Sequence, residues 1–447
     1  MKIERTLSIM LFLCALDISV KAQSPTQNYV LSKDVLDVDG THAITTVTYY
    51  DGLNRLEEST YAEGEDMSQN KNRYSENVLS YSANGSIERL QRYGKKNNGT
   101  FGLIDDLTYS YNGNQIKAIS DKAGSLLYNG SFDFKDGANA DVEYFYDANG
   151  ALVKDLNKGI SNIEYDVLGN MKCITFSNGF KTKYIYDAAG NKLRITHESV
   201  VTNTTDYIGN FVLEDGKLSK YLFDGGYCSF DNNQNPSFHY YEKDHLGSVR
   251  MVVNENGTIE QVNHYYPFGG VYGDLSYKGE LQRNKYIGKE FDHMYGLDWY
   301  DHGARMYDAA RVVWDRIDNL GEKNSDISPY LYCHDNAINK FDPDGNDDYF
   351  SNSGQFLFSK GDSPNIYVAN GNNGFVNFNT LDLRRKNDLN TGVRIVGYYA
   401  RKAGVKYNVN GGRGYVGIST LHRTDNQKDV LAQTKGESIY LKMSNGQ

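Results

Sequence analysis

The chain has 447 residues, of which 39% are hydrophobic and 23% charged, and its formal net charge is −10 at pH 7. This length is enough for two or three domains of ordinary size. A general nucleic-acid-binding protein normally carries a basic face, so the acidic balance argues against a nucleic-acid partner. Tyrosine (37) and glycine (44) are abundant and proline (6) is rare, which favours many short strands and turns over a disordered chain.

The first 22 residues have the pattern of a signal peptide. Basic residues precede an apolar run, residues 7–16, that is too short to span a bilayer, and small residues lead to a cleavage site after Ala22. We therefore expect a mature chain that begins at Gln23 and is secreted or held at the cell surface. A buried N-terminal strand and a lipoprotein attached at Cys14 are the alternatives. No later stretch is long and apolar enough to predict a transmembrane helix.

A Tyr-Asp pair followed by a glycine recurs between residues 144 and 195. The aspartates are Asp147, Asp166 and Asp187, at intervals of about 20 residues, and a glycine follows three positions after each. In a type I turn the Asp side chain accepts hydrogen bonds from the turn backbone, and glycine adopts the left-handed conformation at low cost. The flanking residues alternate as strands do. The pattern predicts successive β-hairpins, with weaker copies at 50–54, 81–85 and 111–114, and continuations at 215–216 and 254–257.

Five further motifs follow one another between residues 238 and 345. They are Asp-His-Leu-Gly-Ser-Val (244–249), Tyr-Tyr-Pro-Phe-Gly (265–269), Tyr-Ile-Gly-Lys-Glu (286–290), Gly-Ala-Arg-Met-Tyr-Asp (303–308) and Asp-Pro-Asp-Gly (342–345). Within them, the residue types favour structural roles: a hydrogen bond for the side chain of His245, and an ion pair with a nearby carboxylate for Arg305.

In wording and order these motifs resemble the RHS repeat-associated core domain, and the Tyr-Asp hairpins resemble the YD repeats of the same proteins. The resemblance implies an all-β fold in which hairpins coil into a shell-like spiral sheet with the core at its end. It also implies a division into a signal peptide (1–22), a YD-repeat region (23–237), the core (238–345) and a small variable C-terminal tail (346–447).

The function implied is that of a secreted or surface shell protein that encapsulates or presents a toxin-like tail, with a role in competition between bacteria and an immunity protein as partner. The alternative is a surface structural or adhesive protein, with a cell-surface or carbohydrate partner and no active cargo. Three cysteines, Cys173, Cys228 and Cys333, would remain after export, and isolated buried thiols are expected for them.

The tail offers no recognisable catalytic site. It contains neither an H-E-x-x-H nor a C-x-x-C pattern, so no metal or other cofactor is predicted. Residues 412–417 match G-x-G-x-x-G outside a strand–helix context, and His422 stands in a polar stretch with Arg423 and Asp425. Short strands are expected at 393–396 and 438–441. Because the sequence stops directly after the latter, a truncated tail is one interpretation.

The only chemistry predicted for this chain is self-cleavage, and it comes from the resemblance. In the family, two aspartates near the end of the core cut the chain just after the Asp-Pro-x-Gly motif. The matching residues are Asp318 and Asp342, with Asn346–Asp347 as the bond cut. One carboxyl would stay protonated as the acid while the other acts as the base. The alternative is that both are turn residues.

Three departures from the family pattern weigh against cleavage. Residues 311–313 read Arg-Val-Val where Leu-Gly-Arg is usual, Asn319 replaces a proline, and Asn346 replaces a leucine.

Overall fold

In the computed structural model, the described part of the chain is 44–342, except for 65–66, 125, 127–131, 224, 274–281, 319–320, 322–325 and 341. Strands at 20–24, 27–34, 348–350, 356–358, 366–369, 375–377, 432–435 and 438–441 are described as well. The chain divides into two compact units, Met1–Gly345 and Asn346–Gln447. Within the described residues, no helix has the length and apolar character needed to cross a membrane.

The first large sheet of the N-terminal unit contains eight strands in chain order, each antiparallel to the next. The strands are β1 (Val20–Ser24), β2 (Gln27–Asp34), β3 (Ile44–Tyr50), β4 (Leu56–Glu63), β5 (Glu76–Tyr81), β6 (Ile87–Lys95), β7 (Phe101–Asn112) and β8 (Gln115–Asp121). The predicted cleavage site after Ala22 thus falls within β1, whereas residues 1–19 lie outside the described residues.

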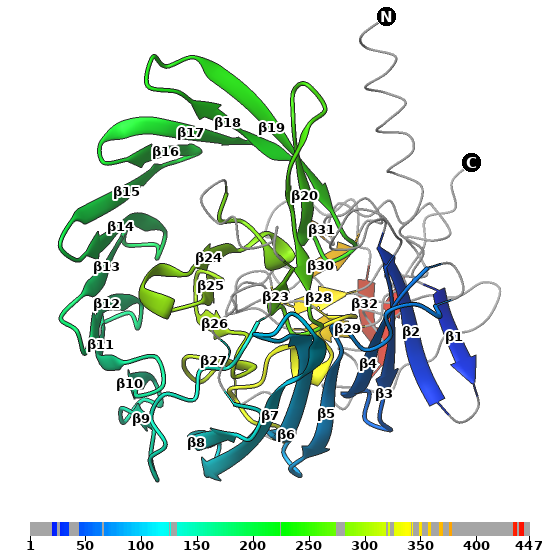
Figure 1. Ribbon diagram of the computed structural model, residues 1–447. Helices are drawn as coiled ribbons and strands as arrows, with labels where there is room; N and C mark the ends of the chain where they lie inside the picture. The colour runs from blue at the N-terminus through cyan, green and yellow to red at the C-terminus, as the bar shows by residue number, and fades with distance from the viewer. Residues whose placement is uncertain are drawn as a thin grey trace, which may run out of the picture. The chain divides into compact units, whose positions relative to one another are not determined.

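The second large sheet has 13 strands, again in chain order, and curves around the segment that follows it (Figure 1). Its strands are β9 (Tyr144–Tyr146), β10 (Leu152–Asp155), β11 (Ile160–Tyr165), β12 (Met171–Phe176), β13 (Lys181–Tyr186), β14 (Lys192–Glu198), β15 (Thr202–Ile208), β16 (Phe211–Glu214), β17 (Lys217–Phe223), β18 (Gly226–Phe230), β19 (Pro236–Lys243), β20 (Val249–Asn254) and β21 (Ile259–Val262). Consecutive hairpins therefore build both sheets, and the predicted all-β repeat fold is confirmed.

The segment after the second sheet forms two small antiparallel sheets and several 3-10 turns. The elements are β22 (His264–Tyr265), β23 (Val271–Tyr272), η1 (Tyr286–Gly288), β24 (Glu290–Asp292), η2 (Met294–Gly296), β25 (Trp299–Asp301), β26 (Met306–Asp308), β27 (Val313–Trp314) and η4 (Cys333–Asp335). The C-terminal unit has a mixed sheet of β28 (Asp348–Phe350), β29 (Phe356–Phe358), β30 (Ile366–Ala369) and β31 (Phe375–Asn377), and a hairpin of β32 (Ala432–Lys435) and β33 (Ser438–Leu441). The strand predicted at 438–441 is confirmed, while 393–396 lies outside the described residues.

The repeat turns have the predicted geometry. The carboxylate oxygen Oδ1 of Asp187 accepts hydrogen bonds from the backbone N–H groups of Ala189 (2.8 Å) and Asn191 (2.9 Å). Gly190 has φ +80°, in the left-handed region where a side chain is strained. The turns at Asp147 and Asp166 repeat the same carboxylate contacts.

The repeat tyrosines connect each hairpin to the preceding one. The hydroxyl group of Tyr165 donates a hydrogen bond to the carbonyl oxygen of Leu152 at 2.8 Å. Tyr81 and Tyr111 make the same kind of bond to Leu56 and Ile87, at 2.5 Å each. In each pair, the acceptor begins the strand that follows the previous repeat turn. Tyrosine suits these positions because its ring packs in the core while its hydroxyl group donates a hydrogen bond to a backbone carbonyl oxygen.

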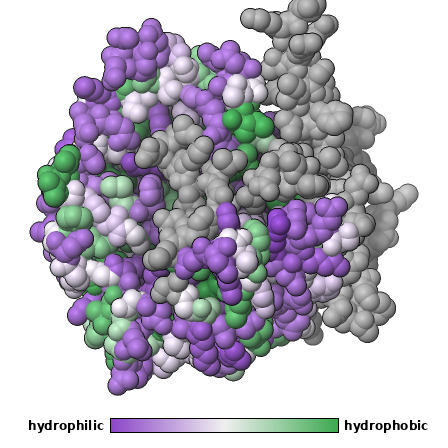
Figure 2. All heavy atoms as spheres, viewed as in Figure 1, coloured by the Kyte–Doolittle hydropathy of each residue, from purple (hydrophilic) through white to green (hydrophobic). Residues whose placement is uncertain are grey.

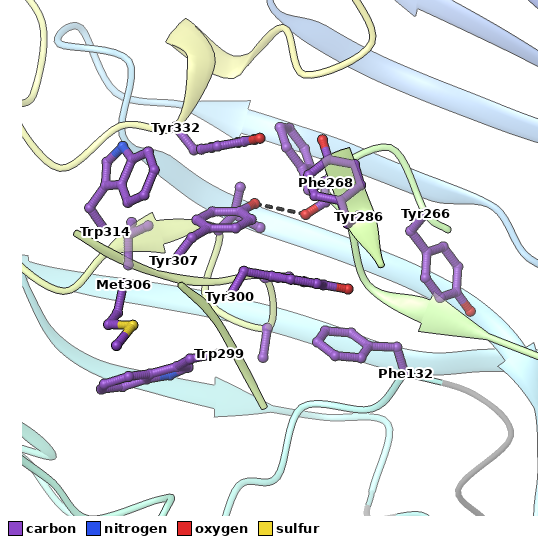
Figure 3. Packing of buried hydrophobic residues seen from close by; sticks show 14 of the residues in the cluster. Phe132, Tyr266, Phe268, Tyr286, Trp299, Tyr300, Met306, Tyr307, Trp314 and Tyr332 are labelled. Carbon is purple, nitrogen blue, oxygen red and sulfur yellow. Dashed lines mark hydrogen bonds between the residues drawn. The ribbon is translucent and has the colours of Figure 1, made fainter. Parts of the chain in front are cut away.

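One hydrophobic core joins both large sheets to the segment between residues 264 and 342. Figure 3 shows its aromatic centre, where the rings of Tyr307 and Tyr332 stack with centroids 3.9 Å apart. The hydroxyl group of Tyr307 donates a hydrogen bond to the carbonyl oxygen of Phe268 at 2.8 Å. Because both large sheets cover this segment, its polar side chains are held in a low-dielectric setting.

The visible face of the molecule is mostly hydrophilic, with small separate hydrophobic patches (Figure 2). Inside, Cys173, Cys228 and Cys333 are buried and free, as predicted.

Candidate functional site: two aspartates on one arginine

Arg305 is placed by the turn that connects β25 to β26. Gly303 has φ +93°, and the backbone N–H of His302 donates to the carbonyl oxygen of Arg305 at 3.1 Å, which closes the turn. The guanidinium carbon of Arg305 lies 4.3 Å from the centroid of the Trp314 ring in β27. This cation–π contact and the small exposure of the side chain, 4%, fix the guanidinium group inside the core.

Asp318 and Asp342 both contact the guanidinium group of Arg305. Its Nη2 atom lies 3.0 Å from Oδ2 of Asp318 and 3.3 Å from Oδ2 of Asp342. The two aspartates follow Arg305 by 13 and 37 residues. The predicted ion pair of Arg305 is confirmed, and the structure brings together the two carboxylates that the family resemblance selected. The side chain of Asp318 is 27% exposed and that of Asp342 9%.

His302 holds the backbone at Asp342. Its Nδ1 atom lies 2.7 Å from the carbonyl oxygen of Asp342, so Nδ1 carries the hydrogen and donates it. Burial, helped by the nearby Lys289 charge, lowers the pKa of His302 well below its usual value. A neutral imidazole therefore anchors the segment that carries Asp342. Sequence reasoning gave His302 no role, although it directly precedes the Gly-Ala-Arg-Met-Tyr-Asp motif at 303–308.

This arrangement can perform acid–base chemistry. Carboxyl groups serve as general acids and bases, and Arg305 holds two of them at one guanidinium nitrogen. Asp318 also sits in a turn: its N–H donates to the carbonyl oxygen of Pro329 and its own carbonyl oxygen accepts from Gly321, each at 3.0 Å. The predicted bond, Asn346–Asp347, lies outside the described residues.

His245, the other residue singled out in the core, has a structural contact. Its Nε2 atom lies 2.9 Å from the carbonyl oxygen of Ile338. The stretch 412–417 and the group at His422, Arg423 and Asp425 lie outside the described residues.

Residues 311–313, where the sequence has Arg-Val-Val and not the Leu-Gly-Arg of the family pattern, are buried in the core. Arg311 is buried and its Nε atom forms an ion pair with Oδ2 of Asp308 at 2.7 Å. Val312 stands where the family pattern has glycine, and its φ of +60° is in the left-handed region. A β-branched residue there stores backbone strain, on the order of 1–3 kcal/mol, that the surrounding packing must hold.

Three other aspartates form the one group of the described residues with metal-ligand geometry. Carboxylate oxygens of Asp105, Asp121 and Asp133 lie within 4.8 Å of one another, a donor set suited to a hard divalent cation. Asp105 and Asp133 already pair with Arg92 (3.0 Å) and Lys135 (2.6 Å). These cations offset part of the local negative charge.

Chains of Tyr-Asp hairpins closed over an aromatic core define the class of YD-shell proteins. The family model described as Teneurin YD-shell matches residues 27–320, and the chain belongs to this family. A second model, described as Metallopeptidase toxin 2, matches residues 348–447. The protein is therefore a YD-shell protein that carries a domain of toxin-family type at its C-terminal end, and the resemblance drawn from the sequence is confirmed.

Similar curated proteins include the Salivary gland surface protein 1 of Aedes aegypti, 27% identical over 45% of this chain and 6% of that protein. The tRNA3(Ser)-specific nuclease WapA of Bacillus spizizenii is 28% identical over 55% of this chain and 11% of that protein. The chain thus spans about a tenth or less of the length of these relatives.

Among solved structures, TcdB2-TccC3 is 17% identical with a TM-score of 0.47, over 71% of this chain and 19% of that chain. The same assembly without its hypervariable C-terminal region is 15% identical with a TM-score of 0.36, over 72% of this chain and 22% of that chain.

The donor set of the tail does not fit a common catalytic zinc site. Such sites use three protein ligands, most often histidines together with a carboxylate. Residues 348–447 contain one histidine, His422, no cysteine, and acidic residues scattered along the sequence.

Proposed function

We propose that the protein is an exported toxin whose YD-repeat unit presents the C-terminal domain and releases it by cutting its own chain. The proposed division is a signal peptide at 1–22, repeats at 23–237, the core at 238–345 and the tail at 346–447. The two family matches support this division, as does the separation of the chain into compact units after Gly345. The toxin-family match of the tail also favours this function over that of an adhesive protein without cargo.

The observation that carries the proposal is the shared contact of Asp318 and Asp342 with Nη2 of Arg305. A pair of turn aspartates would not need a common buried cation. Asp342 lies four residues before Asn346 in the sequence, so the proposed cleavage site is close to the pair along the chain.

The reaction is the hydrolysis of the Asn346–Asp347 peptide bond. One carboxylate takes a proton from water, and the water oxygen bonds to the carbonyl carbon of Asn346. The other carboxyl gives its proton to the amide nitrogen of Asp347, and the C–N bond breaks. Asp318 is the more exposed of the two and is assigned to the water, while the shielded Asp342 is assigned to the leaving nitrogen. Arg305 keeps both side chains in place throughout.

The test is the purified full chain on a denaturing gel, with the mass and new N-terminus of each band determined. Wild type should give a fragment of roughly 100 residues, about 11 kDa in proportion to the 50.4 kDa chain, that starts at Asp347. Asp318→Asn and Asp342→Asn should each leave the chain intact. Asp326→Asn, an exposed aspartate of the same segment, is the matched control and should be cut like wild type. An uncut wild-type chain, or equal cutting in all variants, would remove the self-cleavage proposal.

Export and an immunity partner belong to the same proposal. The signal-like N-terminus and the toxin-family tail support them. N-terminal sequencing of the mature protein should find Gln23, and Met1 on cytoplasmic material would contradict export. The producing cell would need a protein that binds the tail, and pull-down with the intact chain from that cell should recover it.

A further inference from the structure

A second constellation of reactive side chains lies on the strands at the far end of the 13-stranded sheet. Oγ of Ser229 is 2.8 Å from Nε2 of His239, and Nδ1 of His239 is 2.5 Å from Oε2 of Glu260. We propose that Ser229, His239 and Glu260 form a nucleophile–base–carboxylate triad that hydrolyses small uncharged carboxylic esters.

Strand pairing places the three residues on one face of the sheet. In the β18–β19 ladder Tyr227 is opposite His239 and Ser229 is opposite Ser237, so Ser229 and His239 are diagonal neighbours on the same face. Glu260 reaches this face from β21, where the register shifts beside Val253. The amide group of Asn254 donates to Oε1 of Glu260 at 3.2 Å and holds the carboxylate in place.

The hydrogen bonds assign a role to each residue. Because Glu260 accepts from Nδ1–H of His239, the lone pair of Nε2 is free to accept the proton of the Ser229 hydroxyl group. The carboxylate then stabilises the imidazolium ion that forms. The ring of Tyr227 stacks on the imidazole with centroids 4.4 Å apart and an interplanar angle of 9°, which fixes its plane. His239 is buried, whereas Ser229 is half-buried and can be reached by a small molecule.

Lys220 supplies a cation beside the nucleophile. It is directly opposite Ser229 in the β17–β18 ladder, and its Nζ atom lies 5.5 Å from the centroid of the Tyr227 ring. A lysine opposite Ser229 is suited to an oxyanion that develops on a carbonyl group attacked by Ser229. Leu222 and Tyr241 pack against Tyr227 and form an apolar surface next to the triad. The site thus fits an ester with a small apolar acyl group.

The proposed reaction balances with water as the only co-reactant. Oγ of Ser229 bonds to the ester carbonyl carbon while its proton moves to Nε2 of His239. The bond from that carbon to the alcohol oxygen breaks, and the alcohol leaves with the proton from Nε2. Water then attacks the acyl-serine by the same route, which releases the carboxylic acid and restores Ser229.

The experiment uses the purified full chain with a fluorophosphonate probe and with p-nitrophenyl acetate. The expected result is phosphonylation of Ser229, located by peptide mass spectrometry, and ester hydrolysis that falls to the buffer rate in Ser229→Ala. Glu260→Gln should lower the rate at least about tenfold, because the imidazole then loses its fixed tautomer. His239→Gln should likewise lower ester hydrolysis to the buffer rate, because the Ser229 hydroxyl group then has no base to accept its proton.

Ser237→Ala is the matched control, because Ser237 is an exposed serine opposite Ser229 on the neighbouring strand. It should be labelled and should hydrolyse ester like wild type. Asp342→Asn should also be labelled at Ser229, which separates this proposal from self-cleavage. Circular dichroism confirms that each variant is folded. No label on Ser229 in the folded wild-type chain, or unchanged hydrolysis in Ser229→Ala, would overturn the proposal.

Discussion

Arg92 and Glu76 form an ion pair with Nε and Oε1 2.7 Å apart, and both side chains are completely buried. The same guanidinium group binds Asp105 at 3.0 Å and donates to the carbonyl oxygens of Ala309 and Ala310. Arg92 thereby ties three strands of the eight-stranded sheet, β5, β6 and β7, to the turn after β26, which leads to the candidate site.

Replacement of Arg92 by Met should destabilise the protein by about 3–5 kcal/mol, because two buried carboxylates and two carbonyl oxygens lose their partner. Urea unfolding followed by far-UV circular dichroism measures the change. Arg89→Met is the control: Arg89 pairs with Asp106 at 3.2 Å but is 44% exposed, so its loss should cost at most about 1 kcal/mol. Equal losses in the two variants would contradict the role given to Arg92.

Two repeat glycines should respond differently to alanine. Gly190 and Gly150 have φ values of +80° and +78°, so either substitution incurs backbone strain of about 1–2 kcal/mol. A Cβ atom at Gly190 has no close neighbour, whereas at Gly150 it would lie 2.8 Å from the hydroxyl oxygen of Tyr330 and 2.9 Å from Cγ2 of Ile317. Gly150→Ala should therefore lose a further 1–3 kcal/mol or so. Midpoints of thermal unfolding that coincide for the two variants would refute this.

Tyr307→Phe should cost about 1–3 kcal/mol. The substitution removes the hydroxyl group that binds the carbonyl oxygen of Phe268 at 2.8 Å and leaves that buried oxygen without its hydrogen bond. Tyr240→Phe, at an exposed tyrosine of β19, should stay within about 0.5 kcal/mol of wild type. Both are compared by urea unfolding, and a loss in the Tyr240 variant as large as that in the Tyr307 variant would be inconsistent with this hydrogen bond.

The contribution of the Asp105 carboxyl group to the free energy of unfolding should decrease as pH rises. Burial raises its pKa from 3.8 to about 6, although Arg92 acts in the opposite direction. The folded protein therefore holds this proton more tightly than the unfolded chain. The contribution is present in full below about pH 4 and is lost as pH rises through about 6, with a slope of at most about 1.4 kcal/mol per pH unit.

Asp105→Asn lacks this titration, so the difference in unfolding free energy between wild type and variant should shift against wild type over that range. Urea unfolding of both proteins between about pH 4 and pH 7 measures it. A difference that stays constant with pH would count against a raised pKa.

The hairpins were predictable because their information is local. Asp187, Gly190 and the alternating residues around them lie within a dozen positions, and a turn needs only a carboxylate acceptor and a residue that tolerates positive φ. The order of strands in each sheet also followed from this local information, because consecutive hairpins pair with their neighbours. The free, buried cysteines and the structural contact of His245 were also predictable from residue type and surroundings.

The partners of Arg305 were less accessible from sequence. Arg305 was expected to find one carboxylate, and the resemblance selected Asp318 and Asp342, but their contact with a single Nη2 atom depends on segments 13 and 37 residues away that the core brings together. His302 was missed for the same reason, because its acceptor is a backbone oxygen at Asp342. Neither the contacts of Arg305 nor the hydrogen bond of His302 produces a repeating pattern in the sequence.

Sequence by itself determined the repeat fold, because strand alternation and turn chemistry act between near neighbours along the chain. Only the tertiary structure decided which polar side chains meet. Ser229, His239 and Glu260 come from three strands, and their alignment depends on the register of the β18–β19 ladder and on the shift beside Val253. A one-residue change of register would turn each of these side chains to the opposite face of the sheet. These strands bury Tyr227, Val249 and Val252 in a cluster of their own, and this packing joins residues from different hairpins, which no short stretch of sequence encodes.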